Sequence, residues 1–256
     1  MDLLLKGKVA IVGGASKGLG RACAQALAEE GVNVSLCSRS RPDLEKAAQE
    51  IRSGTGTDAM AFAGDLDRPE TVRDLVAATV AHYGRLDVLV NNSGGPPLAY
   101  ARTATEEQWA TAVQRSLLFF ARMSREALPH LKQSGGGRII NILASTVYQP
   151  IPNLALSGAT RMGVVAFAKS LADEVPDGVR PIQVSGEGQD IGAGLVANLL
   201  GGALEVWLRP AAQRHVHAFL GQRLRACPAQ PLARPADDCD LAFQHQIHAL
   251  SALCVF

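Results

Sequence analysis

Residues 12–20 read Val-Gly-Gly-Ala-Ser-Lys-Gly-Leu-Gly (VGGASKGLG) and stand between a short β-branched run and a helical pattern. A glycine-rich loop in that setting is typical of a nucleotide phosphate site. Gly14 allows a tight turn, Gly18 lets the backbone approach a pyrophosphate, and Gly20 lets the helix pack closely on the strand. The helix start also offers free backbone N–H groups and a positive dipole end to phosphates. An ordinary glycine-rich turn is the alternative, and the flanking strand and helix favour the phosphate loop.

The residues after the second predicted strand indicate which nucleotide such a loop would serve. Ser38 and Arg39 follow that strand, where a site for unphosphorylated adenosine ribose usually carries a carboxylate. An arginine accommodates a 2′-phosphate, because its planar fork stays charged and matches phosphate oxygens. Lys17, in the glycine loop, adds a second cation. The sequence therefore predicts NADP, with NAD as the alternative cofactor and solvated surface cations as the alternative role for these side chains.

The first 175 residues alternate strand-like and helix-like patterns with short connections. This alternation predicts a parallel sheet wrapped in helices, and the most apolar strands should have both faces covered. We therefore expect one Rossmann-like, doubly wound α/β domain over residues 1–180. The predicted strands are 8–12, 32–37, 59–63, 86–90 and 139–142, and the predicted helices are 18–30, 43–51, 69–83, 106–131 and 157–174.

Composition and charge exclude several classes of protein. Of 256 residues, 47% are apolar and 19% are charged, and the net charge is +1. This apolar content supports a folded core, and the small net charge gives no strong field for nucleic acid or acidic lipid. The amino-terminal apolar run is too short for a signal peptide, and the five cysteines have no framework spacing. We expect reduced thiols, a cytoplasmic location, and neither a nucleic-acid nor a membrane partner.

Several motifs, taken in order, give the chain a family resemblance. The glycine spacing of the phosphate loop, an Asp-Leu pair after the third strand and the stretch NNSGG at 91–95 resemble the short-chain dehydrogenase/reductases over residues 5–180. The resemblance implies that Asp65 and Leu66 contact the adenine ring, and that Asn91 steadies the central strand near the cofactor. The cofactor contacts predicted in this way are Gly14, Ser16, Lys17, Gly18, Leu19, Gly20, Ser38, Arg39, Asp65, Leu66 and Asn91.

The same resemblance implies a catalytic Ser–Tyr–Lys trio helped by an asparagine, and here the chain departs from the family. In the trio a nearby cation lowers the pKa of the tyrosine, which exchanges a proton with oxygen as hydride moves to or from carbon. Ser157 stands at the tyrosine position and Arg161 at the lysine position, and no Tyr-x-x-x-Lys occurs anywhere. Ala144 stands at the serine position and Ser116 at the asparagine position. This pattern resembles a divergent branch of the family that has Ser-x-x-x-Arg and generally keeps a serine at the position of Ala144. Ser145 or Thr146 would take the place of that serine after a small local shift of the chain.

The serine and the arginine allow more than one role. A hydroxyl is a weaker acid than tyrosine by several pKa units, and a neighbouring charge typically moves a pKa by about 1–3 units, so Ser157 is a poor proton donor. Arg161 neither gives nor takes a proton near neutral pH. It is able to hold a ribose hydroxyl of the cofactor, or a carboxylate or phosphate of a substrate. Water is an alternative proton source, and Tyr148 is expected only to line the pocket.

The sequence changes character towards its carboxyl end. No lysine follows Lys169, and Arg, Ala, Pro, Cys and His accumulate without strand–helix alternation. We expect residues 181–256 to form an atypical, partly disordered segment, and a shift of reading frame between residues 175 and 186 would explain its composition. The apolar run 191–208 contains glycines and falls short of a membrane span. The histidines and cysteines lack zinc-site spacing, so we predict no metal.

These observations favour an NADP-preferring oxidoreductase that acts on a small carbonyl or alcohol by hydride transfer. The first rival is a dinucleotide-binding protein without turnover, such as a redox sensor or an assembly subunit, because all four usual catalytic groups are altered. The second rival is an inactive product of a shifted reading frame. By analogy with the family we also expect a homo-oligomer, a tetramer, with the helices 106–131 and 157–174 at a subunit interface.

Overall fold

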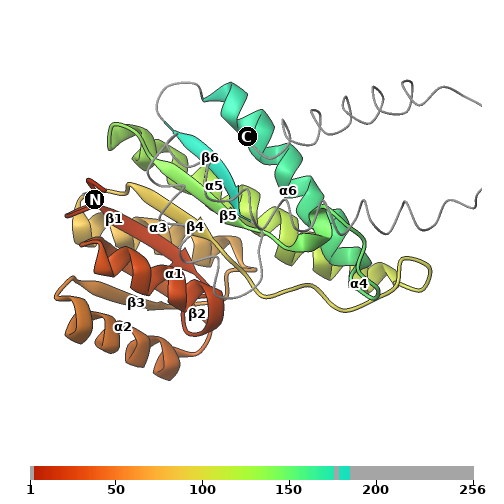
Figure 1. The fold of residues 1–256 in the computed structure, drawn as a ribbon, viewed down its shortest axis with the longest axis horizontal. Helices are drawn as coiled ribbons and strands as arrows, with labels where there is room; N and C mark the ends of the chain where they lie inside the picture. Colours follow the sequence, from red (N-terminus) through yellow and green to blue (C-terminus); the bar gives the residue numbers. More distant parts are fainter. Residues whose placement is uncertain (1–2, 176–178, 185–256) are drawn as a thin grey trace, which may run out of the picture. The chain divides into compact units, whose positions relative to one another are not determined.

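The computed structural model describes residues 3–175 and 179–184 of the chain. Six parallel strands form one sheet in the order β3-β2-β1-β4-β5-β6 (Figure 1), which confirms the predicted Rossmann-like fold. The strands are β1 Val9–Gly13, β2 Asn33–Ser38, β3 Ala59–Ala63, β4 Val88–Asn91, β5 Arg138–Ile142 and β6 Arg180–Val184. The helices are α1 Gly18–Glu29, α2 Arg41–Thr55, α3 Pro69–Tyr83, α4 Glu106–Val113, η1 Gln114–Leu118, α5 Phe119–Gln133, η2 Ser145–Val147 and α6 Ala155–Glu174.

The winding of the sheet reverses at β1. On one side β1 pairs with β2, where Ala10 lies opposite Val34, and on the other side it pairs with β4, where Ala10 lies opposite Val88. The chain therefore winds outward to β3 and then returns to the middle of the sheet to begin its second half. Open α/β sheets bind ligands outside the carboxyl ends of their strands at such a switch point. The loops after β1 and β4 are thus the place to look for a site.

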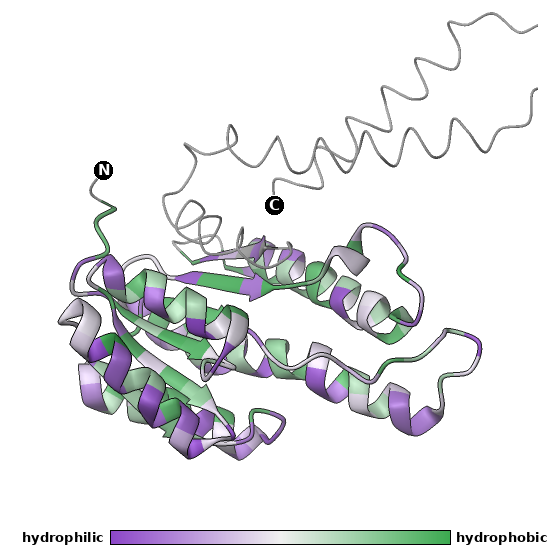
Figure 2. Cartoon of the chain, turned by 60° about the horizontal axis from the view of Figure 1, so that its bottom comes forward, coloured by the Kyte–Doolittle hydropathy of each residue, from purple (hydrophilic) through white to green (hydrophobic). Residues whose placement is uncertain are grey.

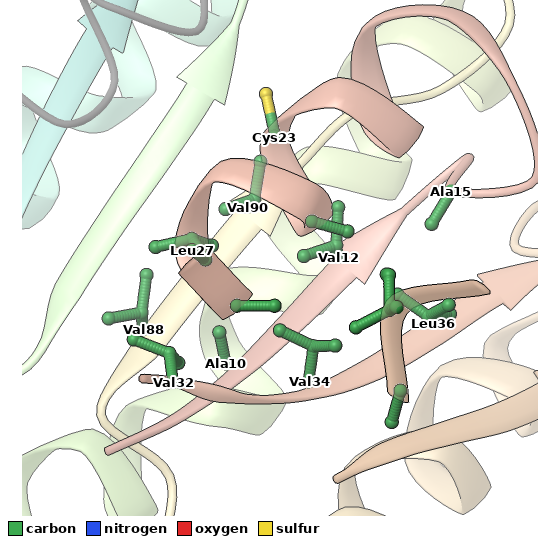
Figure 3. Packing of buried hydrophobic residues seen from close by; sticks show 14 of the residues in the cluster. Ala10, Val12, Ala15, Cys23, Leu27, Val32, Val34, Leu36, Val88 and Val90 are labelled. Atoms are coloured by element: carbon green, nitrogen blue, oxygen red, sulfur yellow. The ribbon is translucent and has the colours of Figure 1, made fainter. Parts of the chain in front are cut away.

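Helices cover both faces of the sheet, and this explains why its strands are so apolar. Val12 and Leu36 face α1 and α2, and Figure 3 shows Leu27 and Cys23 of α1 packed over these strands. The odd-numbered neighbour Ile11 points the other way, into a second core built with α3, α5 and α6. Figure 2 shows the matching pattern, with hydrophobic strands inside and hydrophilic residues on the outer sides of the helices.

The predicted helix 106–131 is the element that differs most from expectation. Thr105 caps its start, because the threonine hydroxyl accepts the N–H of Gln108 and the Gln108 side chain bonds back to the Thr105 N–H. Helix α4 then ends at Val113, and the five-residue π-helical turn η1 separates it from α5. The sequence contains no glycine or proline at this point, so neither usual sign of a helix interruption was present. Such π-turns often mark functional sites.

The sheet also runs further than expected. Strand β6 pairs with β5 from Arg180 to Val184, past the predicted domain boundary at residue 180. Within the described part of the chain, no helix is both long enough and apolar enough to cross a membrane. The apolar run 191–208 and the histidine- and cysteine-rich region after it lie outside the described residues.

Candidate functional site

The glycine loop after β1 adopts the turn for which its glycines were singled out. Gly14 and Gly18 both have a φ of +60°, in the left-handed region that favours glycine. A Cβ on Gly20 would lie 2.4 Å from the Gly14 carbonyl oxygen, so only glycine lets α1 approach the loop this closely. At Gly18, by contrast, no atom lies within 4 Å of the position a Cβ would take. The loop therefore packs tightly on its inner side and is open at Gly18.

Asn92, a residue that the sequence analysis did not single out, joins this loop to the end of β4. Its Nδ2 donates a hydrogen bond to the Gly13 carbonyl oxygen at 3.1 Å. On the side of β2, the Ala15 N–H donates to the Cys37 carbonyl oxygen at 3.0 Å. The loop is thus fixed to the strands on both sides of β1. The second asparagine of the NNSGG stretch was the available signal for this role.

The amino terminus of α1 is open to an anion. Lys17 is the N-cap residue, and its side chain makes no capping hydrogen bond. The first turn of α1 contains no acidic residue, in contrast to α4 with its threonine cap and its two glutamates. Backbone N–H groups in the first turn of a helix have no partner within the helix, and the dipole favours negative charge there. This end of α1 therefore fits a phosphate or pyrophosphate group.

Two cations, one at the start of α1 and one after the end of β2, have no counter-ion within the described residues. Lys17 and Arg39 are both exposed, and within the described residues no carboxylate forms an ion pair with either. The Ser38 carbonyl oxygen accepts the Gly64 N–H at 2.9 Å, which brings the end of β3 next to the end of β2. Ser16, also predicted to contact the cofactor, is half-buried in the glycine loop. This corner of the sheet combines unpaired positive charge with hydroxyl groups.

The predicted adenine contacts lie after β3. Leu66 is buried, and its Cδ1 would be 3.3 Å from a Cβ placed on Gly13, so it packs against the start of the glycine loop. Asp65 is half-buried, and its Oδ1 accepts the Asp67 N–H at 3.1 Å, which shapes the turn into α3.

Burial, with a smaller contribution from the Asp65 charge, raises the pKa of the Cys37 thiol to about 12. That thiol is consequently protonated and inert at neutral pH.

Asn91 connects the centre of the sheet to α5. It is fully buried, and its Nδ2 donates to Asn141 Oδ1 at 2.9 Å and to Ser124 Oγ at 3.2 Å. These two partners come from β5 and α5, so one amide group links three elements. Asn91 thus has a structural role at the centre of the sheet, and its place near the cofactor stays a prediction.

The residues that the resemblance aligns with the four catalytic positions come from η1, from α6 and from the residue before η2. Ser116 lies in the π-turn and is fully buried, and its Oγ has no hydrogen-bond partner within the part of the chain that the structure describes. Ser157 and Arg161 lie on α6 and are also buried. Arg161 Nη1 donates to the Ile142 carbonyl oxygen at 2.9 Å, which places the guanidinium at the carboxyl end of β5. Its Nε is buried without a partner, and burial lowers the pKa of the guanidinium.

The substitutes considered for the missing catalytic serine lie in and beside η2. Ala144 precedes it, and Ser145 begins it; both are half-buried. The Thr146 hydroxyl is buried without a hydrogen-bond partner. Tyr148 follows the turn but is 61% exposed, so its phenol is at the surface. Within the described residues, no phenol takes the place of the missing tyrosine.

Two further residues that sequence reasoning missed hold the π-turn in place. The Ser93 hydroxyl donates to the Arg115 carbonyl oxygen at 3.1 Å, so the loop after β4 binds η1. The Arg115 side chain forms an ion pair with Asp67, with 3.1 Å between Nε and Oδ2. The turn that contains Ser116 is therefore attached to the loops after β3 and β4.

Within the described residues, no group of three or more His, Cys, Asp or Glu side chains could hold a metal ion.

A parallel sheet with a glycine loop and an open helix start at its switch point defines a dinucleotide-binding domain of the Rossmann type. A sequence profile described as short chain dehydrogenase matches residues 8–188. An uncharacterized oxidoreductase of Methylorubrum extorquens is 37% identical over 171 residues, which cover 67% of this chain and 68% of that protein. The chain belongs to the short-chain dehydrogenase family.

Two further proteins are similar to this chain, one in sequence and one in structure. A 3-oxoacyl-(acyl-carrier-protein) reductase of Vibrio cholerae is 33% identical over 171 residues, which cover 67% of this chain and 68% of that protein. The crystal structure of L-sorbose reductase from Gluconobacter frateurii, in complex with NADPH and L-sorbose, has a TM-score of 0.71 and 29% identity and covers 84% of each chain.

Proposed function

We propose that the chain is an oxidoreductase that transfers hydride between NADP(H) and a small carbonyl or alcohol compound. The observation that carries the proposal is the uncapped start of α1 after a glycine loop that Asn92 fixes to β4. The NADPH bound by L-sorbose reductase, a protein of similar structure, supports it. When bound, NADP(H) supplies or accepts the hydride. The glycine loop and α1 would hold its pyrophosphate, and Asp65 and Leu66 its adenine.

The preference for NADP(H) over NAD(H) rests on Arg39 and Lys17. Both cations are exposed and unpaired among the described residues; Arg39 follows the end of β2, where the adenosine ribose would lie, and Lys17 is the N-cap residue of α1. An arginine fork forms charge-assisted hydrogen bonds with a phosphate, which the ribose of NAD lacks. These side chains therefore add affinity for NADP(H) alone.

The proton for the reaction has to come from a source other than tyrosine. In the reduction direction hydride adds to the carbonyl carbon, and the oxygen takes one proton. The Ser157 hydroxyl is too weak an acid to supply it unaided, and Arg161 keeps its proton. We propose that a water molecule, ordered by the hydroxyls of Ser145 and Ser157 near the end of β5, relays the proton to that oxygen from bulk solvent, from which it regains a proton in turn.

The second candidate is a protein that binds the dinucleotide without turning it over. The altered residues at all four catalytic positions favour this alternative, and the intact loop is consistent with either function. Mixing the purified chain with NADPH and a panel of carbonyl compounds separates the two. Tight NADPH binding without NADPH oxidation would support the second candidate.

A titration of NADPH and NADH tests the cofactor assignment directly. Arg39→Ala should weaken NADPH binding by about 1–3 kcal/mol and leave NADH binding unchanged. Arg73→Ala, which removes an exposed arginine from α3, is the matched control and should change neither affinity. Equal losses for both nucleotides in Arg39→Ala would contradict the assignment.

The assembly and the carboxyl-terminal segment add two smaller proposals. Leu118 and Met162 are 38% and 48% exposed on the helices expected at a subunit interface, which supports a homo-oligomer, measurable by light scattering.

The family match ends at residue 188, close to the change in composition. We therefore keep the proposal that the reading frame shifts before that point; resequencing that finds no better-patterned alternative frame would overturn it.

A further inference from the structure

Arg161 carries a buried charge with no counter-ion. Its side chain is 7% exposed, and none of the ion pairs within residues 3–175 and 179–184 involves it. Nη1 donates to the Ile142 carbonyl oxygen at 2.9 Å, and Nε is buried without a partner. Although burial lowers its pKa, a guanidinium stays protonated near neutral pH. A charge in this state is costly unless an anion accompanies it.

The engaged Nη1 determines which edge of the guanidinium is left for a ligand. A carboxylate binds arginine with two parallel hydrogen bonds, either from both Nη atoms or from Nε and one Nη. Because the Ile142 carbonyl already takes Nη1, the remaining edge is formed by Nε and Nη2. Neither of these nitrogens has a hydrogen-bond partner among the described residues. This free edge has the shape of a carboxylate receptor.

Two hydroxyls of segments packed on α6 are likewise buried, and within the described residues they have no hydrogen-bond partner. Ser116 Oγ and Thr146 Oγ1 belong to η1 and η2, the two segments that pack against α6. A Cβ on Gly158 of α6 would lie 3.3 Å from the Thr146 carbonyl oxygen, which shows how close η2 and α6 are. A hydroxyl can donate, and a guanidinium can only donate. The three elements η1, η2 and α6 therefore each carry a buried donor that, within the described residues, has no acidic side chain as a partner.

The position of this group of donors is at the ligand-binding edge of the sheet. Ile142 is the last residue of β5, and β5 pairs with β4, whose end is joined to the glycine loop. A ribose hydroxyl or a water molecule could accept from Nε, but neither would neutralise the charge. A carboxylate would do both. This distinction separates an anionic substrate from a neutral one.

We infer that Arg161 receives a carboxylate of the substrate through its Nε–Nη2 edge, so that the compound reduced or formed is an oxo acid or hydroxy acid rather than a neutral ketone or alcohol. The inference rests on the proposed function and adds its substrate class. Ser116 and Thr146 act as positioning residues that donate to the same anion or to water bound with it.

Binding to the protein–NADPH complex tests the inference, with three acids and their methyl esters as probes: pyruvate, acetoacetate and levulinate. Calorimetry and steady-state kinetics should show that at least one acid has an affinity about tenfold to a hundredfold above that of its ester. Arg161→Lys keeps a charge but loses the fork; it should abolish this preference and change the NADPH affinity less than twofold. Arg125→Lys, at an exposed position on α5, is the matched control and should leave both affinities unchanged.

The outcomes separate the inference from the proposed function. Absence of NADPH binding to the wild-type chain overturns the proposed function and the inference with it. Normal NADPH binding without any acid–ester preference overturns the inference alone. Loss of NADPH affinity in Arg161→Lys with the preference retained also overturns it, because Arg161 would then serve the cofactor. If Arg161→Lys does not fold, the variants Ser116→Ala and Thr146→Ala, which keep the Arg161 charge, take its place. Each should lower the affinity for the acid at least threefold. If both variants bind the acid as the wild type does, the inference is overturned.

Discussion

Replacing Gly18 with alanine isolates the phosphate-binding role of the glycine loop, because Gly84 provides a matched control. Both glycines are left-handed, with φ of +60° and +75°, and at both no atom lies within 4 Å of the position of a Cβ. Alanine in this region costs about 1–2 kcal/mol through backbone strain alone. For a domain of this size about 1 kcal/mol corresponds to about 2–4 °C. Both variants should therefore lose about 2–8 °C of thermal stability without nucleotide.

Nucleotide binding should then separate the two variants. The methyl group of Gly18→Ala enters the open side of the loop at the start of α1, where we place the pyrophosphate, whereas Gly84 caps the end of α3. We expect NADPH affinity to fall at least tenfold, about 1.4 kcal/mol, in Gly18→Ala and to stay unchanged in Gly84→Ala. At a concentration 100 times the wild-type dissociation constant, NADPH should stabilise the wild type by about 2.7 kcal/mol and Gly18→Ala by about 1.4 kcal/mol or less.

Calorimetry for affinity and thermal unfolding with and without NADPH supply the two measurements. Equal NADPH affinity in the two variants would refute the assignment of the open space at Gly18 to the pyrophosphate. A loss of affinity in Gly84→Ala as large as in Gly18→Ala would show that backbone strain, rather than the blocked space, weakens binding.

Three further changes test other contacts. Gly20→Ala puts a Cβ 2.4 Å from the Gly14 carbonyl oxygen, so α1 must move away and urea unfolding should show a loss of about 1–3 kcal/mol; an unchanged midpoint would contradict this packing. Asn91→Ala removes the donor of the hydrogen bonds to Asn141 Oδ1 and Ser124 Oγ. It should lower the free energy of unfolding by about 1–3 kcal/mol in the same assay, and an unchanged value would show that the amide is dispensable. The hydrogen bond from His82, at 2.8 Å, holds the pKa of Asp58 below its usual range. That stabilisation is present above the unfolded-state pKa of the carboxyl and is lost as pH falls through the lower folded-state pKa. Asp58→Asn should therefore cost less than about 1 kcal/mol at pH 6, because both side chains are about half exposed, and this cost should shrink as pH falls through the folded-state pKa of the carboxyl; a cost that does not shrink on acidification would contradict it.

The fold was predictable because its signals are local and repeated. For β1 to β5 the predicted strands agree with the observed ones within two residues, since apolar runs of that length between helical patterns leave few alternatives. The π-turn η1 was not predictable, because it comes from the way the segment packs and no residue type announces it. Ser93 and Asp67, which hold it from two loops, are far from it in sequence. Strand β6 was missed because Pro181 and the arginine before it obscure the apolar pattern.

In the candidate site, too, some residues could be predicted from the sequence, whereas others depend on contacts that only the fold creates. Gly14, Gly18 and Gly20 could be singled out from the sequence because a backbone role depends on the residue's lack of a side chain. The structure shows left-handed backbone at Gly14 and Gly18 and a close packing contact at Gly20, and the approach of Gly18 to a pyrophosphate stays a prediction. Asn92 was missed because its partner is a backbone carbonyl of a distant strand. The sequence showed that Arg161 replaces a lysine but could not show which of its nitrogens would be left free. That depends on the Ile142 carbonyl, which only the fold brings into reach.

The structure also relates two departures from the family pattern that look independent in the sequence. Ser93 stands where the family motif has alanine, and Ser116 stands where it has asparagine. The Ser93 hydroxyl binds the carbonyl of Arg115, the residue before Ser116, inside the π-turn. A change at one position therefore alters the backbone that presents the other. The same turn packs on α6, which carries Ser157 and Arg161, so three of the four altered catalytic positions belong to one packed unit. Substitutions that accumulate within one such unit are those expected when a site is rebuilt for a different ligand, and the Arg161 charge, which has no ion-pair partner within the described residues, is the basis on which we infer an anionic one.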